Sequence, residues 1–369
     1  MDKLNLNDCD GNKLKINRSA LEDDLESLND FVLSSNFNNF SYAKHAMFET
    51  EIKANNDIEG LNDSLDEIKK VILNKKVKSK DDIRILNLYK GYLYILNSND
   101  INKDSVRNLY SILSKDLLNE HDSSLMGDYY RLAPVYILNG ASLTKEPFLG
   151  VDFHKLPKYM DDFFKFTNSD LLEDSNISNF VKSQIMHFYF VYVHPYFDVN
   201  GRTSRTVSMW KLLNNKNYPY IIFNRAISNN KSGYEKSLIK GRKTSDMTAF
   251  LKYMIKSVRN TLEMELVLQS IIKNSNKHIT RDDSEMIEYI LMMNGYLTLK
   301  DLKEEYNRHN DAKNRFKIFK ENIVPLIDKN IILLKDKVKD GNNYYFKLNC
   351  DLIDTDDRKI KTFKLDKYI

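Results

Sequence analysis

His194-Pro-Tyr-Phe-Asp-Val-Asn-Gly-Arg-Thr-Ser-Arg205 is the stretch around which this chain is organised. An apolar, aromatic run over 185–193 precedes it, and a helical pattern over 206–213 follows it. The proline disfavours the helical conformation for His194, so one helix should end there. The Asn-Gly pair marks a turn after which a second helix can start. The stretch therefore predicts a helix–loop–helix with an anion site at the second helix N-terminus, where free N–H groups and the helix dipole favour phosphate.

Each residue type in the stretch suits phosphate chemistry. His194 has an unperturbed pKa that suits proton abstraction near neutral pH. Asp198 is a hard oxygen ligand for Mg²⁺, which arrives with nucleotide phosphates. Asn200 can donate to a phosphate oxygen, and Gly201 lets the main chain approach one.

Two arginines complete the predicted site. Arg202 and Arg205 lie three residues apart, so both should project from one side of the first helical turn. Their planar guanidinium groups match phosphate oxygens. A buried capping histidine with surface arginines is the simpler alternative for any single residue.

The stretch resembles the signature of the Fic (Fido) family, His-Pro-Phe-x-Asp/Glu-Gly-Asn-Gly-Arg-x-x-Arg. Members of that family mostly transfer AMP from ATP to a protein hydroxyl and release pyrophosphate. The resemblance implies a mainly α fold, with a Fic-type helical core and a small β-hairpin flap. It also implies ATP as substrate, Mg²⁺ at Asp198 and His194 as the catalytic base. The nucleotide phosphates would be bound at 199–202 and Arg205.

Two positions depart from the family signature. Tyr196 replaces the usual Phe, whose ring is expected to anchor the loop in the core. Val199 replaces the first Gly of the Gly-Asn-Gly-Arg segment. If the main chain there needs a positive φ, a β-branched residue is strained. Its side chain could also crowd the phosphates, which leaves the rate, the metal position and the choice of nucleotide open.

Residues 55–60, Asn-Asn-Asp-Ile-Glu-Gly, resemble the family's inhibitory motif, Ser/Thr-x-x-x-Glu-Gly/Asn. Carried over, Glu59 would pair with Arg205 and obstruct placement of the ATP γ-phosphate. An Arg–carboxylate pair can be bidentate, so this competition is chemically reasonable. Asn55 stands where Ser or Thr is usual. The alternative is a surface glutamate before Gly60, a glycine suited to end the helix that Ser41 would cap.

Residues 127–131 resemble the segment that leads the family into its flap. Two β-like runs, 135–138 and 141–143, flank Asn139-Gly140, which predicts a hairpin. The resemblance implies that a target protein binds along this flap, Val135–Leu143, as an added strand. An ordinary surface hairpin explains the same pattern.

The rest of the core reads as helices. An aromatic residue helps form the adenine pocket in the family, and Tyr234 is the nearest match, with simple core packing as the alternative. His187 reads as a core histidine. Helical patterns cover 21–75, 81–96, 105–118, 157–168, 177–193 and 248–272. Asp104 or Ser105 is expected to cap the helix over 105–118, and Ser228 is expected to cap the helix that contains Tyr234.

A polar linker over 273–281 separates the core from a C-terminal pattern. Helices are expected over 283–294, 299–306 and 313–329, the second of them capped by Thr298. Two β-like runs, 331–334 and 344–348, follow around a turn at 340–343. This order of elements resembles a winged-helix (α+β) domain. Lys313, Arg315, Lys317 and Lys320 could contact DNA phosphates, although a solvated face, protein docking or homodimer formation explains them too. The expected domains are 1–75, 76–272 and 282–369.

Composition narrows the possible partners and the cellular compartment of the protein. The 56 basic and 52 acidic residues leave a net charge of +4, too balanced to indicate nucleic acid by itself. The only cysteines, Cys9 and Cys350, make no disulfide framework or zinc cluster and suit a reducing cytoplasm. No apolar run is long enough to span a membrane, and the first residues lack a signal peptide's apolar core.

The function expected is that of an autoinhibited protein AMP-transferase, acting on a target protein or on itself. Three alternatives stay open. The same site could remove AMP, with Glu59 near the attacking water. It could transfer another phosphate-linked group, from GTP, UTP or CDP-choline. The chain could also be a non-catalytic regulator that senses nucleotide and binds DNA.

Overall fold

The structure is a computed structural model. The predicted Ser41 cap, the turn at Asn139-Gly140, the β-like run over 141–143, Lys313 and the turn at 340–343 lie outside the residues that it describes. Those residues are 1–34, 44–61, 63–75, 77–98, 100–137, 148–169, 176–214, 223–293, 297–298, 300, 302–303, 306, 314–335 and 345–353.

The chain forms two compact units. The first comprises Met1–Ile58 and Leu65–Val258, and the second comprises Glu59–Ser64 and Arg259–Ile369. The domain boundaries expected at 75 and 282 stay predictions. The N-terminal elements bury their apolar residues within the first unit, and the second unit begins inside an uninterrupted helix, α12 (Thr248–Asn274).

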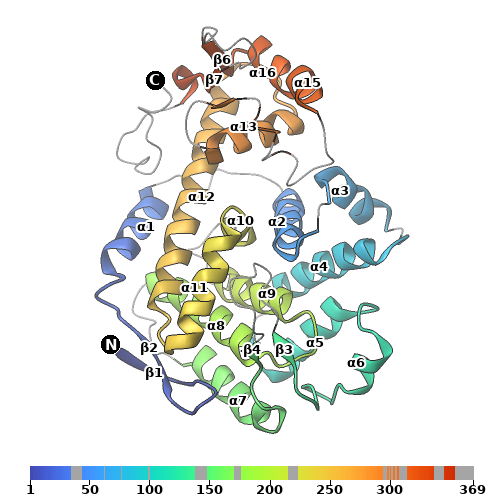
Figure 1. Ribbon diagram of the computed structural model, residues 1–369, viewed down its shortest axis with the longest axis vertical. Helices are drawn as coiled ribbons and strands as arrows, with labels where there is room; N and C mark the ends of the chain where they lie inside the picture. Colours follow the sequence, from blue (N-terminus) through green and yellow to red (C-terminus); the bar gives the residue numbers. More distant parts are fainter. Residues whose placement is uncertain are drawn as a thin grey trace. The chain divides into compact units, whose positions relative to one another are not determined.

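Helices α8 (Asn176–Val193) and α9 (Asn200–Leu213) lie side by side at the centre of the first unit (Figure 1). From 180 onward α8 is buried on nearly every face, as expected for a core helix. Around this pair pack α4 (Lys80–Leu96), α5 (Lys103–Ser114), α7 (Leu156–Thr167) and α10 (Phe223–Ser228).

Helix α9 is buried although its sequence is polar. Thr203 and Thr206 donate their hydroxyls to main-chain carbonyls one turn back in α9, and Ser208 donates across to the carbonyl of Ser183 in α8 (2.7 Å). These bonds satisfy the hydroxyls inside the helix and let it pack closely. Trp210, fully buried, donates its indole N–H to the carbonyl of Ser98 at 2.6 Å and packs edge-on against Tyr94.

Two predicted caps were wrong. Helix α5 is capped by Asn102, which exchanges a pair of bonds with Ser105, so the helix starts earlier than 105 and ends at Ser114. Helix α11 (Lys231–Thr244) is capped by Asn230, because Ser228 is the last residue of α10. In both cases a nearby Asn competes with Ser or Asp for the cap, and Asn is as good a cap.

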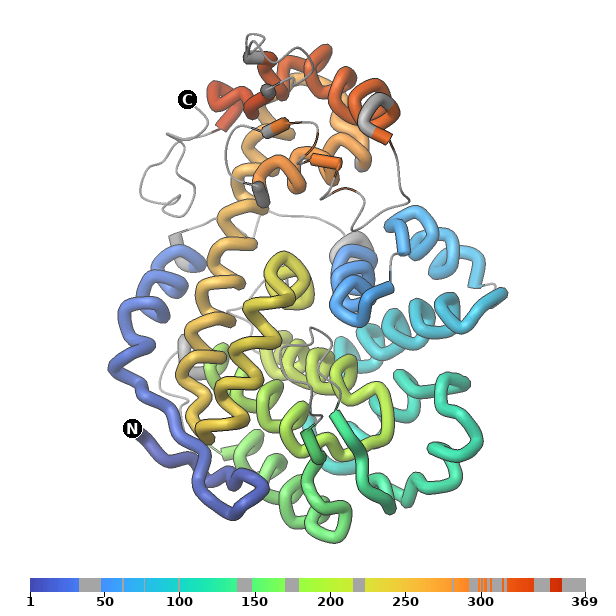
Figure 2. Tube along the Cα trace, viewed as in Figure 1, coloured from blue at the N-terminus to red at the C-terminus, as the bar shows by residue number. Residues whose placement is uncertain are grey.

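A hairpin of β1 (Asp2–Asn7) and β2 (Lys13–Ile16) opens the chain and was not predicted. Its buried residues alternate, Leu4 and Leu6 on one strand and Leu14 and Ile16 on the other. It joins the turn between α11 and α12 through Lys15, whose N–H donates to Ser245 and whose carbonyl accepts from Met247, both at 2.9 Å. Figure 2 shows this hairpin beside the start of α12.

The first strand of the flap lies within the predicted run 135–138. The strand that pairs with it lies after residue 143, where the predicted hairpin ended. Strand β3 (Tyr136–Ile137) pairs antiparallel with β4 (Phe148–Leu149), so that Tyr136 faces Leu149. The smaller helices of this unit are α1 (Glu22–Ser34), α2 (Lys44–Glu59), α3 (Leu65–Asn74), α6 (Glu120–Ser124) and a 3-10 turn at Phe153–Lys155.

The second unit has the winged-helix order of elements. Helix α13 (Arg281–Met293) precedes β5 (Leu297–Thr298), which contains the Thr298 expected as a cap. The predicted third helix is divided into α15 (Arg315–Ile318), a π-helix (Phe319–Ile323) and α16 (Val324–Asp328). Strands β6 (Ile332–Lys335) and β7 (Tyr345–Leu348) pair antiparallel and β5 adds to β7; a 3-10 turn, Cys350–Leu352, follows. No helix within the described ranges is long and apolar enough to cross a membrane.

Gly241 tests the packing of α11 on α8. A Cβ there would lie 2.6 Å from Cε2 of Phe188, closer than real contacts allow. Gly241→Ala gains about 1 kcal/mol of helix propensity, but overpacking costs about 1–3 kcal/mol. We expect the free energy of unfolding, measured by urea titration with circular dichroism, to fall by about 1 kcal/mol.

The exposed neighbour Lys240→Ala serves as the control and should be near neutral. The double variant Gly241→Ala, Phe188→Leu should recover part of the loss that Gly241→Ala adds, because Leu vacates the ring position. Strict additivity of the two changes would show that the contact does not limit packing.

Candidate active site

The loop between α8 and α9 is closed by one side-chain amide. Asn200 accepts a hydrogen bond from the N–H of Tyr196 at 3.0 Å and donates to the carbonyl of Tyr196 at 2.8 Å. Asn200 is buried and its amide closes the loop, whereas its expected contact with a phosphate oxygen stays a prediction. The Tyr196 ring is buried against Tyr110 with ring centroids 3.6 Å apart, which anchors the loop in the core as predicted.

Val199 adopts the left-handed conformation, with φ 63° and ψ 10°. This is the condition under which the sequence predicted strain at this position. The Val199 side chain is buried, so packing of the isopropyl group offsets part of the conformational cost. The main chain therefore follows the course for which glycine is suited, although the residue is valine.

His194 ends α8 and is partly exposed. Its φ is 54°, and its Nδ1 lies 3.2 Å from the carbonyl of Val191. A carbonyl can only accept, so the hydrogen of the neutral ring is on Nδ1. Nε2 is then the nitrogen that can accept a proton. The loop thus holds His194 in the tautomer that a general base needs.

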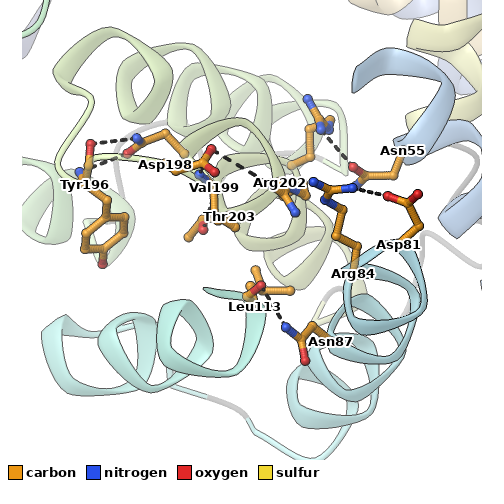
Figure 3. Close-up of polar contacts among 12 residues, drawn as sticks. Asn55, Asp81, Arg84, Asn87, Leu113, Tyr196, Asp198, Val199, Arg202 and Thr203 are labelled. Carbon is orange, nitrogen blue, oxygen red and sulfur yellow. Dashed lines mark hydrogen bonds and ion pairs between the residues drawn. The ribbon is translucent and has the colours of Figure 1, made fainter. Parts of the chain in front are cut away.

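Asp198 and Arg202 lie together at the start of α9 (Figure 3). Oδ1 of Asp198 accepts from the N–H of Val199 at 2.5 Å and lies 3.7 Å from Nη2 of Arg202. Asp198 is exposed and Arg202 is buried. Gly201 begins the first turn of α9, and its carbonyl accepts the hydroxyl of Ser204 at 2.8 Å.

The donor set fits Mg²⁺ bound with nucleotide. In the part of the chain that the structure describes, no three His, Cys, Asp or Glu side chains gather to hold a metal ion. Mg²⁺ commonly needs only one or two carboxylates because waters and substrate phosphates supply its other ligands. The exposed carboxylate of Asp198, beside the N-terminus of α9, matches that pattern.

Arg205 contacts helix α2 through Asn55. Its Nη2 donates to Oδ1 of Asn55 at 2.8 Å, and both side chains are buried. The residue that departs from the family's Ser or Thr is therefore the one that binds the second motif arginine. Glu59, the expected partner, is exposed at the end of α2 and is grouped with the second unit, so its pairing with Arg205 stays a prediction.

One turn before Asn55, Glu51 attaches α2 to α10. Its carboxylate accepts from the N–H groups of Asn224 at 2.8 Å and Arg225 at 3.4 Å. Full burial raises the pKa of Glu51 to about 7, although these N–H donors and the Arg225 charge act in the opposite direction. The amide of Asn224 donates in turn to the hydroxyl of Tyr92 at 3.1 Å.

Tyr234 lies in the core. It is buried, and its hydroxyl is 2.9 Å from Nε2 of His187. Burial, with the positive charge of Arg205, lowers the pKa of His187 to about 3, so this ring stays neutral. His187 is a core histidine, as predicted. The contacts of Tyr234 match the core-packing alternative to an adenine contact.

The site residues that sequence reasoning missed are Asn55 as the Arg205 partner, Glu51 and Arg131. The guanidinium of Arg131 donates to the carbonyl of His194 at 2.9 Å. All three contacts join residues far apart in the chain, so no local spacing predicts them, although Arg131 ends the segment 127–131 that resembles the family's. Of the basic residues proposed for DNA, Lys317 and Lys320 are exposed.

Residues 100–212 match the model of the Fic/DOC family. This part of the chain is a Fic/DOC family domain. Members of the family commonly transfer AMP or another nucleotide-linked group. The matched Fic segment runs from the start of α5 through nearly all of α9 and includes the loop that holds His194.

Solved Fic proteins share the fold. A Fic family protein from Desulfovibrio desulfuricans G20 has a TM-score of 0.58 at 20% sequence identity, covering 89% of this chain and 96% of that chain. A fragment of Fic-1 from C. elegans has a TM-score of 0.54 at 16% identity, covering 70% of this chain and 74% of that chain. At these identities the likeness concerns the fold alone.

The conformation of Val199 predicts an unusual order of stabilities. Val199→Ala and Val199→Gly both remove the buried isopropyl group, and they differ only by a Cβ in the left-handed region. We expect the Gly variant to be more stable than the Ala variant by about 1 kcal/mol in urea unfolding. The opposite order, which is usual in helices, would show that the loop does not hold φ positive at 199.

Glu51 predicts a pH dependence of stability. The unfolded carboxyl titrates near its ordinary pKa of 4.5, whereas the folded one keeps its proton up to about 7. Between these values the folded state binds the extra proton, so the free energy of unfolding should fall as pH rises, by roughly 3 kcal/mol across the window.

Glu51→Gln should remove this pH-dependent loss, because the amide cannot ionise. Glu49→Gln, on the same helix, is the control and should keep the wild-type slope. Urea unfolding across the window measures all three proteins. An unchanged slope in Glu51→Gln would assign the pH dependence to other groups.

Proposed function

We propose that this chain is a protein adenylyltransferase that transfers AMP from ATP to a hydroxyl side chain of a target protein or of itself. The observation that carries the proposal is the His194 ring. Its Nδ1 lies 3.2 Å from the carbonyl of Val191, which favours the tautomer whose basic nitrogen is Nε2, and the ring lies in the loop that leads into α9. The match of residues 100–212 to the Fic/DOC family supports nucleotidyl transfer as the reaction.

In this reaction the hydroxyl oxygen of the target attacks the α-phosphorus of ATP. A new P–O bond forms as the bond from the α-phosphorus to the bridging oxygen breaks, and pyrophosphate leaves. The proton of the hydroxyl passes to Nε2 of His194. Catalysis then rests on orientation and on charge stabilisation rather than on a covalent enzyme intermediate.

The start of α9 supplies the charge stabilisation. N–H groups in the first turn of a helix point outward along its axis, so the start of α9 suits phosphate oxygens. Arg202 and Arg205 add positive charge, with Arg205 assigned to the γ-phosphate. Mg²⁺ bound at Asp198 would neutralise part of the phosphate charge.

The proposed inhibition acts through α2. Asn55 already brings α2 to Arg205, and Glu59 follows Asn55 by one helical turn. Residues four apart share a helix face, which supports Glu59 as a competitor of the γ-phosphate for Arg205. Release of Glu59 would then free Arg205 for nucleotide.

The proposed target site is the flap, Val135–Leu143. Tyr136 and Leu149, which face each other across β3 and β4, are 66% and 55% exposed. An extended peptide could add to this short sheet through main-chain bonds and cover both side chains.

Labelling with α-labelled ATP and Mg²⁺ tests the proposal. Glu59→Gly should incorporate label into protein more strongly than wild type, because Arg205 becomes available to the γ-phosphate. Adding His194→Ala should abolish the label, since loss of a general base costs about 10²–10⁴-fold. Gel autoradiography measures the incorporation.

Two controls sharpen the result. Glu59→Ala separates loss of the carboxylate from the flexibility of glycine, and His278→Ala removes an exposed histidine of the second unit. Labelled GTP, UTP and CTP test other nucleotides. Equal labelling by wild type, Glu59→Gly and the His194→Ala double variant would sink the proposal. Loss of an AMP-removing activity in Glu59→Gly would indicate the alternative function, in which water attacks the attached AMP and releases it from the protein hydroxyl.

A further inference from the structure

Arg131 lies at the start of the flap and is 1% exposed. Its guanidinium donates to three main-chain carbonyls: Nε to His194 at 2.9 Å, Nη1 to Ala133 at 2.7 Å and Nη2 to Val151 at 2.5 Å. Its main-chain N–H donates to the carbonyl of Pro195 at 3.0 Å. One residue therefore binds both of the first two residues of the signature.

The three carbonyls belong to three different segments. Ala133 lies on the entry to β3, Val151 on the exit from β4, and His194 at the end of α8. The exit is further joined to α8 by the N–H of Val151, which donates to Val193 at 3.4 Å. The two stems of the flap and the end of α8 therefore meet at one guanidinium.

This contact has a physical basis in the conformation of His194. A left-handed residue at a helix end turns its carbonyl out of the helical hydrogen-bond ladder, so the oxygen needs another donor. The guanidinium supplies planar, fixed donors in several directions, which an ammonium does not. Burial lowers the pKa of Arg131 to about 10, partly offset by Asp152, so the group remains a cation at neutral pH.

Gly150 provides the space for the guanidinium. A Cβ at 150 would lie 2.8 Å from Nη2 of Arg131 and 2.8 Å from Cγ1 of Val135. The flap exit therefore approaches Arg131 more closely than any other residue type would permit.

We propose that Arg131 is a positioning residue for the transfer reaction, which holds the main chain of His194 and both stems of the flap in a fixed mutual arrangement. The position of the base and that of the target strand are then set by one side chain. This inference rests on the proposed adenylyltransferase function. It assigns to Arg131 no contact with ATP or with the target.

Arg131→Met tests the role in the full-length chain carrying Glu59→Gly, with self-labelling from α-labelled ATP as the activity. We expect the saturating rate to fall on the order of 100-fold, the usual effect of misplacing a reacting group by about 1 Å. The ATP concentration for half-saturation should not change. Arg131→Lys keeps the positive charge but not the planar set of donors. Its saturating rate should therefore lie between those of the parent protein and Arg131→Met.

A second measurement does not depend on activity. The ¹⁵N signals of the His194 ring, assigned with His194→Ala in histidine-labelled protein, report its tautomer and surroundings. Arg131→Met should shift them, because the carbonyl contact that orients His194 is lost.

Arg242→Met is the matched control. Arg242 also donates to a carbonyl at the end of α8, that of Tyr192 at 2.6 Å, and its guanidinium carbon lies 5.0 Å from the ring centroid of Phe148 in the flap. It should lower stability without moving the His194 signals or the saturating rate. Equal losses of rate in both variants, or unmoved His194 signals in Arg131→Met, would overturn the inference.

Two other results, a variant that does not fold and an absence of any transfer activity, can be distinguished from a failure of the inference. If Arg131→Met does not fold, Gly150→Ala is used in its place. This variant retains Arg131 but moves its guanidinium, because the added Cβ occupies the same space. Gly127→Ala, whose Cβ would meet Leu132 and Tyr130 instead, is its control. If Glu59→Gly transfers no label from any nucleotide, the proposed function fails, and the His194 signals alone then decide whether Arg131 positions the ring.

Discussion

The side-chain amide of Asn200 is the contact on which the candidate site depends. It supplies both a donor and an acceptor to the main chain of Tyr196 and so closes the reversal between α8 and α9. Left-handed residues, His194 and Val199, stand at either end of that reversal. Because the loop is so short, the end of one helix and the N-terminus of the next are held together, and the proposed base and the proposed anion site become neighbours.

Two arginines buried in the Fic domain are bound by neutral dipoles. Arg131 is bound by three carbonyls, and Nη2 of Arg205 by the amide oxygen of Asn55. Dipoles of this kind satisfy a charge without neutralising it, whereas an ion pair would cancel it. Arg202 differs from these two, because its Nη2 lies 3.7 Å from the carboxylate of Asp198.

The sequence predicted most helices and the site loop because their signals are local. The Pro after His194, the Asn-Gly pair and the apolar run of α8 all lie within a few turns of one another. The hairpin of β1 and β2 also had a local signal, the alternation of Leu4 with Leu6 and of Leu14 with Ile16, which was overlooked amid polar residues. By contrast, the contacts of Asn55 with Arg205 and of Arg131 with His194 join residues 150 and 63 positions apart. Such pairs follow from tertiary packing, which no spacing in the sequence encodes.

Trp210 gives the protein an intrinsic optical probe at a useful place. It is the only tryptophan in the chain, so excitation at the red edge selects it over the 22 tyrosines. It lies on α9, little more than one turn beyond Arg205, with its indole bonded to Ser98 and packed on Tyr94. Its emission should therefore follow any shift of α9 against α4, and the arrival of a nucleotide at the other end of α9 could be timed in solution without attaching a dye.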